Sequence, residues 1–218
     1  MAAGTGGHVF PALSIAEKLK LQSVTVEWLG TPTGMENKLL SETDIPLHWI
    51  SVKGLRGSGI ARKLFSPIML LIAFLQSLVV ILKIRPNCVL GMGGFICGPA
   101  GVAVKLLGKP LLIHEQNAVA GLTNSLLARV ANEVFEAFPG TFSKKTNAIF
   151  TGNPLRREIL KARKKVEISE DPVIHLLVLG GSQGSRAINR VIPELVVNWT
   201  RPEGLLVFHQ TGTHSLQE

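Results

Sequence analysis

The first turn of the chain combines glycines with a histidine in an order that could support chemistry. It reads Gly4-Thr5-Gly6-Gly7-His8, and an amphipathic run at residues 13–19 follows. Glycines ahead of a helix let backbone N–H groups approach an anion, and the helix dipole favours negative charge there. His8 would then be the first titratable group beside the anion, suited to proton transfer near neutral pH. The alternative is a tight turn with a capping threonine and an incidental histidine.

Two later glycine clusters have the same design. Gly91-Met92-Gly93-Gly94 follows a buried-type strand at 86–90, and Gly180-Gly181-Ser182-Gln183-Gly184 follows another at 173–179. A helix-like segment comes after each cluster. A single cluster is often only a turn, but repeated clusters between a strand and a helix favour an anion site.

A run of polar residues follows the short strand expected at 111–113. It reads His114-Glu115-Gln116-Asn117. In open parallel sheets, ligands bind at the carboxyl ends of the strands. The run is therefore a candidate for substrate contact, and a hydrogen-bonded loop without a ligand is the alternative.

These motifs need a framework, and the rest of the chain supplies strand-like and helix-like segments in alternation. This alternation predicts an α/β fold with doubly wound parallel sheets. The strands of the first part are expected at 23–29, 47–52, 86–90, 111–113 and 134–137, and its later helices at 35–40, 100–107 and 118–131.

Composition shifts divide the chain into two domains. A turn at 151–157 is followed by a charged helix-like segment to 165, and an acidic stretch at 167–171 comes before a fresh strand. We therefore place a domain at 1–165 and a second at 166–218. Only two residues precede the first turn motif at residue 3, and the chain stops soon after a strand at 205–208. We expect a fragment at both ends, with the second domain incomplete.

The most apolar stretch, residues 64–82, carries no charge and has basic residues on both sides. Its length is at the edge of a transmembrane span, although Pro67, Gln76 and Ser77 weaken that interpretation. A buried crossover helix and a helix in the membrane interface remain alternatives. The basic, glycine-broken loop at 53–59 is either a surface loop or a contact for phosphate or lipid head groups.

Composition narrows the function classes. The net charge of +8 over 218 residues implies an anionic partner, such as a phosphorylated metabolite, an acidic lipid or nucleic acid. Nucleic acid is disfavoured because aromatic residues are scarce and the charge is dispersed. Cys88 and Cys97 form neither a disulfide framework nor a metal motif, so we expect a reducing, cytoplasmic setting. The start of the chain lacks a charged segment followed by an apolar stretch, so we expect no signal peptide.

The glycine turns, the His114-Glu115-Gln116-Asn117 run and Gly152-Asn153-Pro154 with Arg156 together resemble one family. It is the MurG family of peptidoglycan glycosyltransferases, and the likeness extends from residue 1 to about 212 in order and spacing. The resemblance implies two Rossmann-like domains of the GT-B type, the second truncated here. The first would bind the membrane-borne acceptor, the second UDP-N-acetylglucosamine, without metal or other cofactor.

The resemblance also implies roles for individual residues. His8 would be the base that deprotonates the acceptor's 4-hydroxyl, with Glu115 as its orienter or as an alternative base. Donor contacts carry over to Thr5, Gly6, Gly7, Asn117, Arg156 and Ser182. Gly91, Gly93 and Gly94 would face the acceptor diphosphate.

The implied reaction moves N-acetylglucosamine from UDP-N-acetylglucosamine to undecaprenyl-diphosphate-linked N-acetylmuramoyl-pentapeptide. It would take place at the cytoplasmic face of the cell membrane, with the protein held peripherally on the anionic surface and without nucleic acid. The rivals are a related glycolipid glycosyltransferase and an inactive, truncated module that binds the membrane surface or a nucleotide.

Overall fold

The computed structural model describes residues 1–52, 66–161, 173–181 and 184–212. The chain forms two compact units, Met1–Arg163 and Lys164–Glu218. The boundary expected after residue 165 and the basic loop at 53–59 lie outside the described residues. Each unit is α/β, and every strand pair in the described residues is parallel, as the alternation in the sequence predicts.

The first unit contains two groups of parallel strands. Strands β1 (Trp28–Gly30) and β2 (Leu47–Trp49) pair with each other. Strands β3 (Val89–Gly91), β4 (Leu111–Glu115), β5 (Glu133–Glu136) and β6 (Ile149–Phe150) form a four-stranded sheet in that order.

The first residues of the chain lie between these two groups of strands. The amino group of Met1 donates to the Leu90 carbonyl at 2.8 Å, and the Met92 N–H donates to the Met1 carbonyl at 2.9 Å. On the other side, Trp28 Nε1 donates to the Ala2 carbonyl. The start of the chain therefore runs beside β3 like a strand, which places the following glycine turn at the carboxyl ends of the strands.

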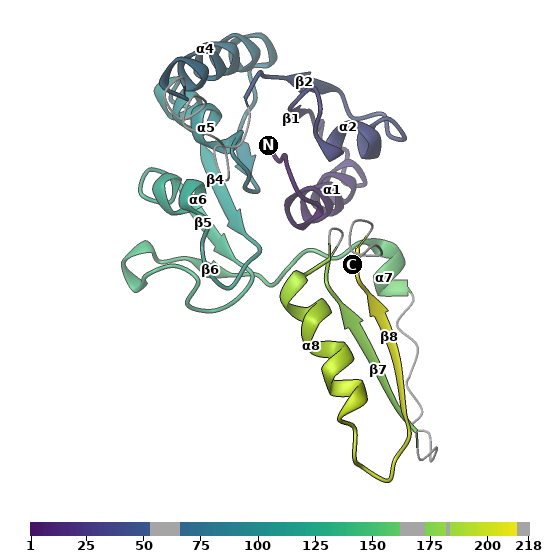
Figure 1. Ribbon diagram of the computed structural model, residues 1–218. Helices are drawn as coiled ribbons and strands as arrows, with labels where there is room; N and C mark the ends of the chain where they lie inside the picture. Colours follow the sequence, from purple (N-terminus) through teal and green to yellow (C-terminus); the bar gives the residue numbers. More distant parts are fainter. Residues whose placement is uncertain (53–65, 162–172, 182–183, 213–218) are drawn as a thin grey trace. The chain divides into compact units, whose positions relative to one another are not determined.

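Helices cover both faces of these strands (Figure 1). Helix α1 (Gly6–Lys20) and α2 (Met35–Leu40) lie near β1, with Val9, Ala12 and Ala16 of α1 in a buried cluster with Trp28. Helices α4 (Ser66–Ile84), α5 (Cys97–Leu106) and α6 (Leu122–Leu127) contribute to a second cluster. A short 3-10 helix, η1 (Lys144–Thr146), and α7 (Arg157–Lys161) complete the unit.

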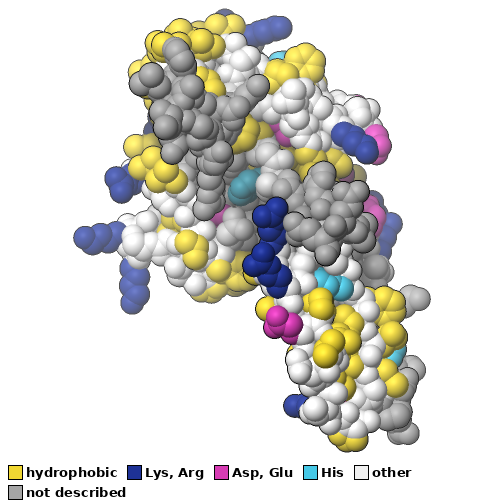
Figure 2. Space-filling view, in the orientation of Figure 1, with side chains coloured by type: hydrophobic (Ala, Val, Ile, Leu, Met, Phe, Trp, Pro, Cys, Tyr) yellow, Lys and Arg dark blue, Asp and Glu magenta, His cyan; other side chains and the backbone are white. Residues whose placement is uncertain are grey.

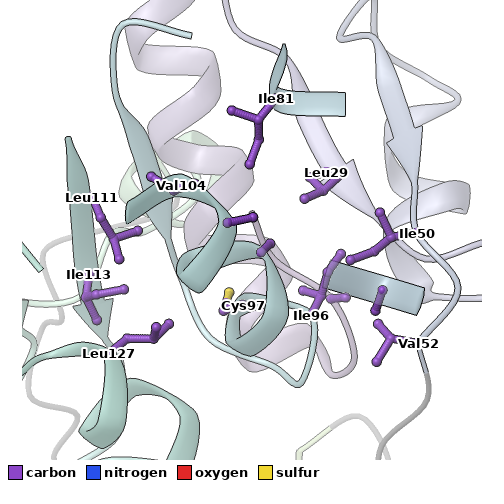
Figure 3. Packing of buried hydrophobic residues seen from close by; sticks show 14 residues of the cluster. Leu29, Ile50, Val52, Ile81, Ile96, Cys97, Val104, Leu111, Ile113 and Leu127 are labelled. Carbon is purple, nitrogen blue, oxygen red and sulfur yellow. The ribbon is translucent and has the colours of Figure 1, made fainter. Parts of the chain in front are cut away.

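The second cluster is centred on α5. In Figure 3, Ile96 and Cys97 lie in the middle, with Leu111 and Ile113 on one side and Ile50 and Val52 on the other. Three small residues of α5, Ala100, Ala103 and Cys97, are fully buried, which lets the helix approach β3 and β4 closely. This packing fixes the sheet edge that carries the polar run.

Several elements differ from their expected bounds: β2 ends at Trp49 instead of residue 52, β3 begins at Val89 instead of residue 86, and α5 begins at Cys97 instead of residue 100. The strand expected at 23–29 is the short β1, because residues 21–24 close the end of α1 in a turn with Ser23 at φ 61°. Helix α1 begins at Gly6, so the glycines form its first turn. The helix expected at 118–131 is only α6, because the Glu115 side chain holds residues 117 and 121 in a loop ahead of it.

The second unit is a βαβ arrangement. Strands β7 (Ile174–Leu179) and β8 (Leu205–Gln210) pair along six residues, and α8 (Arg186–Val197) connects them. The Ser185 side chain caps α8 by accepting from the Ile188 N–H. Ser182, within the third glycine cluster, lies outside the described residues.

Candidate functional site

The first glycine turn and the polar run meet through a hydrogen bond between side chains. His8 lies in the first turn of α1, and its Nδ1 donates to Gln116 Oε1 at 2.7 Å. Gln116 follows β4 directly and is 5% exposed, whereas His8 is half-buried. The structure thus brings together two motifs that lie more than a hundred residues apart, with Gln116 as the direct partner of His8.

Gln116 is held by its neighbour on the strand. Its Nε2 donates to His114 Nδ1 and to the His114 carbonyl, each at 2.9 Å. His114 Nε2 in turn donates to the Gly152 carbonyl at 3.1 Å, in the segment that follows β6. Burial lowers the pKa of the His114 imidazole, against smaller opposing effects of the Gly152 carbonyl and the Glu115 carboxylate. The folded protein therefore favours the neutral ring more strongly than the unfolded chain does.

We expect this lowered pKa to make the stability of the first unit depend on pH. Below the ordinary histidine pKa of 6.5 the unfolded chain binds a proton at His114 that the folded chain does not yet bind. The free energy of unfolding should therefore fall as the pH drops from 6.5 towards the folded pKa, with no contribution from this group above 6.5. Urea titrations between about pH 5 and pH 7.5 measure this.

The matched variant for that experiment is His114→Gln. The stability of this variant should vary less steeply with pH over the same range, because it lacks the His114 imidazole. The other histidines are present in both proteins, so their contribution is the same. Equal slopes for the two proteins would contradict the assignment to His114.

Glu115 lies inside the loop that follows β4 and is 1% exposed. Its Oε1 accepts from the backbone N–H and Nδ2 of Asn117, and its Oε2 accepts from the Gly121 N–H and Asn124 Nδ2. Burial alone would raise the pKa of this carboxyl, but the four hydrogen bonds together hold it below its usual value. With both oxygens occupied, the geometry suits orienting Asn117 better than accepting a proton from substrate.

Two of the expected donor contacts lie near this centre. Asn117 is exposed, and its Nδ2 points to Glu115, which leaves its Oδ1 for other partners. The guanidinium of Arg156 lies over the ring of Phe10 at 4.4 Å, two residues beyond His8 on α1. An exposed cation is thereby held beside the first turn of the helix.

The first turn of α1 presents its backbone to solvent in part. Thr5 and Gly7 are exposed and Gly6 is buried. Thr5 is the N-cap residue, yet its side chain makes no capping hydrogen bond, so the simple capping interpretation of this threonine is not supported. An α-helix of 15 residues with open N–H groups at its start attracts an anion.

The second glycine cluster packs against the first turn. Gly93 has φ +102°, and a Cβ there would lie 2.7 Å from Cε1 and Nδ1 of His8. Gly94 has φ +84°, and its Cβ would lie 2.2 Å from the Ala3 carbonyl oxygen. Gly91 and Gly93 are buried, and Gly94 is half-buried. Packing against His8 and Ala3 is therefore enough to require glycine at positions 93 and 94, even without a ligand. Of Gly91, Gly93 and Gly94, only Gly94 is partly open to solvent.

Two contributors to the site, Gln116 and Asn124, are not identified by the sequence alone. Gln116 was noted only within its run, although it is the residue that contacts His8. Asn124 is 1% exposed and donates to both Glu115 and the His114 carbonyl. Asn124 stands between Thr123 and Ser125, so the sequence gives no signal that sets it apart.

Comparison with known proteins gives matches along the whole chain. A family model described as the N-terminal domain of glycosyltransferase family 28 matches residues 1–136. A curated relative from Acinetobacter baumannii, named UDP-N-acetylglucosamine–N-acetylmuramyl-(pentapeptide) pyrophosphoryl-undecaprenol N-acetylglucosamine transferase, is 46% identical over 222 residues and covers 100% of this chain. A relative of the same name from Methylococcus capsulatus is 46% identical over 220 residues. The chain spans 60% and 61% of the lengths of these two relatives.

Solved structures agree with these matches. The crystal structure of Acinetobacter baumannii MurG is similar with a TM-score of 0.73 and 40% identity, over 100% of this chain and 59% of that one. A Staphylococcus aureus MnaA–UDP structure, 14% identical with a TM-score of 0.55, shares the fold alone. Because the family model covers most of the chain and the fold agrees, the chain belongs to glycosyltransferase family 28.

Proposed function

We propose that the chain serves an inverting transfer of N-acetylglucosamine from UDP-N-acetylglucosamine to undecaprenyl-diphosphate-linked N-acetylmuramoyl-pentapeptide. The observation that carries this proposal is the match, along the entire chain, to relatives whose printed name is that transferase. The site geometry supports it, because His8 lies beside an open helix start at the carboxyl ends of parallel strands.

In the proposed reaction, His8 takes the proton from the acceptor's 4-hydroxyl as that oxygen attacks the anomeric carbon. The bond between the anomeric carbon and the diphosphate oxygen breaks in the same displacement, and UDP leaves with the electron pair. A single displacement inverts the configuration at the anomeric carbon. Negative charge grows on the diphosphate, so backbone N–H groups and a nearby cation stabilise the transition state.

Residues of the first unit fit these roles. Thr5, Gly6 and Gly7 begin α1, and Arg156 is fixed by its stacking on Phe10. Glu115 sets the orientation of Asn117, which we propose as a polar contact to substrate. We propose Ser182 as a donor contact from sequence alone, and among Gly91, Gly93 and Gly94 we give contact with the acceptor diphosphate to Gly94, the most accessible.

A transfer assay tests the proposal. Because the chain spans 60% of its Acinetobacter baumannii relative, the assay uses the extended chain, defined as this chain followed by the part of that relative beyond the match. With UDP-N-acetylglucosamine and polyprenyl-diphosphate-linked muramoyl-pentapeptide, we expect a disaccharide lipid and free UDP. The Acinetobacter relative itself is the positive control, and a thermal melt checks that the extended chain is folded.

The acceptor decides between the remaining alternatives. Transfer to diacylglycerol instead of the muramoyl lipid would identify a glycolipid glycosyltransferase. A folded extended chain that transfers to neither acceptor would contradict the proposal and support a module that only binds a surface or a nucleotide.

We further propose that α4 binds the anionic cytoplasmic face of the cell membrane. By length and composition, α4 is the one helix among the described residues that could cross a membrane. Its most apolar stretch of 18 residues has a mean hydropathy of 2.3, and 17% of that stretch is buried. Its buried residues, Ala73, Ser77 and Ile81, form a single stripe against α5. The remaining residues of the helix are half-buried or exposed, so α4 is covered along one side only, which supports an interfacial helix over a fully buried one.

The opposite face of α4 is apolar and exposed. Leu75 and Val79, each two residues from a buried position and so about 200° around the axis, are 50% and 65% exposed. Hydrophobic side chains gather at the top of Figure 2, where Figure 1 places α4. Lys83 and Arg85 follow at the end of the helix. A helix packed along one stripe with an apolar outer face suits the membrane interface better than a crossing.

Leu75→Glu/Val79→Glu should weaken binding of the chain to vesicles containing anionic phospholipid by about a hundredfold. The change removes two apolar side chains from the bilayer interface and adds negative charge, which anionic lipids repel. Sedimentation with vesicles at constant ionic strength measures the partition. Leu21→Glu is the control, because Leu21 is 73% exposed at the end of α1 and should leave binding unchanged. Equal binding of the double variant and the original chain would refute the proposed surface.

A further inference from the structure

We propose that Gln116 is a positioning residue that holds His8 with its proton on Nδ1, so that Nε2 is the atom that receives the acceptor's proton. The inference deepens the proposed function and depends on His8 as the base. The family resemblance implied roles for His8, Glu115 and Asn117 but none for Gln116.

The orientation of the Gln116 amide follows from its neighbours. One end of the amide lies 2.9 Å from the His114 carbonyl oxygen, and the other lies 2.7 Å from His8 Nδ1. A carbonyl oxygen cannot donate, so the amide nitrogen must face it. The amide oxygen then faces His8 Nδ1, and only a protonated Nδ1 can satisfy that contact.

The second contact of the amide nitrogen agrees with this orientation. Nε2 of Gln116 also lies 2.9 Å from His114 Nδ1, which can accept because His114 Nε2 donates to the Gly152 carbonyl. Both hydrogens of the amide are therefore used on His114, and a rotated amide would place its oxygen against the His114 carbonyl. The Gly152 carbonyl thus fixes the His114 tautomer, His114 fixes the amide, and the amide fixes His8.

Packing restricts the imidazole of His8 as well. The Cα of Gly93 approaches the ring so closely that a Cβ there would lie 2.7 Å from both Cε1 and Nδ1. Gly93 and Gln116 therefore both lie at the Nδ1 side of the ring. Nε2, on the far side, has no hydrogen bond to the described residues and is the atom left for the substrate.

A nuclear magnetic resonance experiment on the chain with ¹⁵N-labelled histidine tests the tautomer. Correlations between ring nitrogens and ring carbon-bound protons distinguish protonated from unprotonated nitrogens, and loss of a signal in His8→Gln assigns His8. We expect protonated Nδ1 and bare Nε2, the reverse of the preference of free histidine. A His8 ring protonated on Nε2 and bare on Nδ1 would overturn the inference.

The matched variants are Gln116→Met, which keeps the length of the side chain without its amide, and Gln22→Met, at an exposed position after α1. Gln116→Met should shift His8 towards the tautomer with the proton on Nε2. In the extended chain it should lower kcat by about 10- to 100-fold with little change in KM for the acceptor. Gln22→Met should change neither. An unchanged His8 tautomer in Gln116→Met would also overturn the inference.

The measurement of the His8 tautomer and the transfer assay test separate parts of the proposal. If His8 is protonated on Nε2 while His8→Ala abolishes transfer, the role of Gln116 is refuted and His8 remains the base. If the tautomer is as expected while His8→Ala transfers normally, the proposed base is refuted, and with it the catalytic purpose of Gln116.

Discussion

His8→Ala is expected to lower kcat of the extended chain by a hundredfold or more. Removing the imidazole removes the group that takes the proton of the acceptor hydroxyl, and general base catalysis contributes about 10²–10⁴-fold. The KM for either substrate should change little, because the imidazole acts mainly in the transition state. Release of UDP and formation of the disaccharide lipid, followed in parallel, measure both parameters.

Two controls separate a base from a structural residue. His48→Ala removes a histidine whose Nε2 pairs with Glu27 near the surface, and it should leave transfer unchanged. Added imidazole should restore part of the turnover of His8→Ala, because the variant leaves space beside the helix start. Turnover of His8→Ala within a few fold of the original would exclude His8 as the base.

Glu115→Gln is expected to lower the free energy of unfolding by about 2–4 kcal/mol, because an amide cannot replace this carboxylate. Both carboxylate oxygens accept from two donors. In either orientation of a glutamine, its NH₂ group would face two of these donors and leave them without an acceptor. The loop that carries Asn117 would lose its anchor, so substrate affinity should fall along with stability.

Urea unfolding near neutral pH and in acid measures this effect. The hydrogen bonds hold the pKa of Glu115 below 4.5, so its stabilising contribution is present above that pH and is lost as the pH falls through the folded pKa. The difference between the original and the variant should therefore shrink in acid. Glu133→Gln, exposed on β5, should stay within about 0.5 kcal/mol of the original. A loss in Glu115→Gln as small as in this control would contradict the anchoring role.

The sequence by itself determined the order of the elements and the place of the motifs. The alternation of apolar and polar segments is local, so β4 and α2 fall within two residues of their expected bounds. The glycine turns, the polar run and Arg156 were recognisable because their residue types and order are visible in the chain. The family likeness rested on these same motifs.

Tertiary structure alone decided which polar groups meet. Gln116 contacts His8 because β4 pairs with β3 and the first residues of the chain run along the other side of β3, which no local pattern encodes. The sequence also does not determine the exposure of α4. An apolar helix has the same composition whether neighbouring elements cover one side of it or all sides. The physical reason is that the hydrophobic pattern along the chain indicates which side chains avoid water. Hydrogen bonds between segments far apart in the sequence depend instead on how those segments pack.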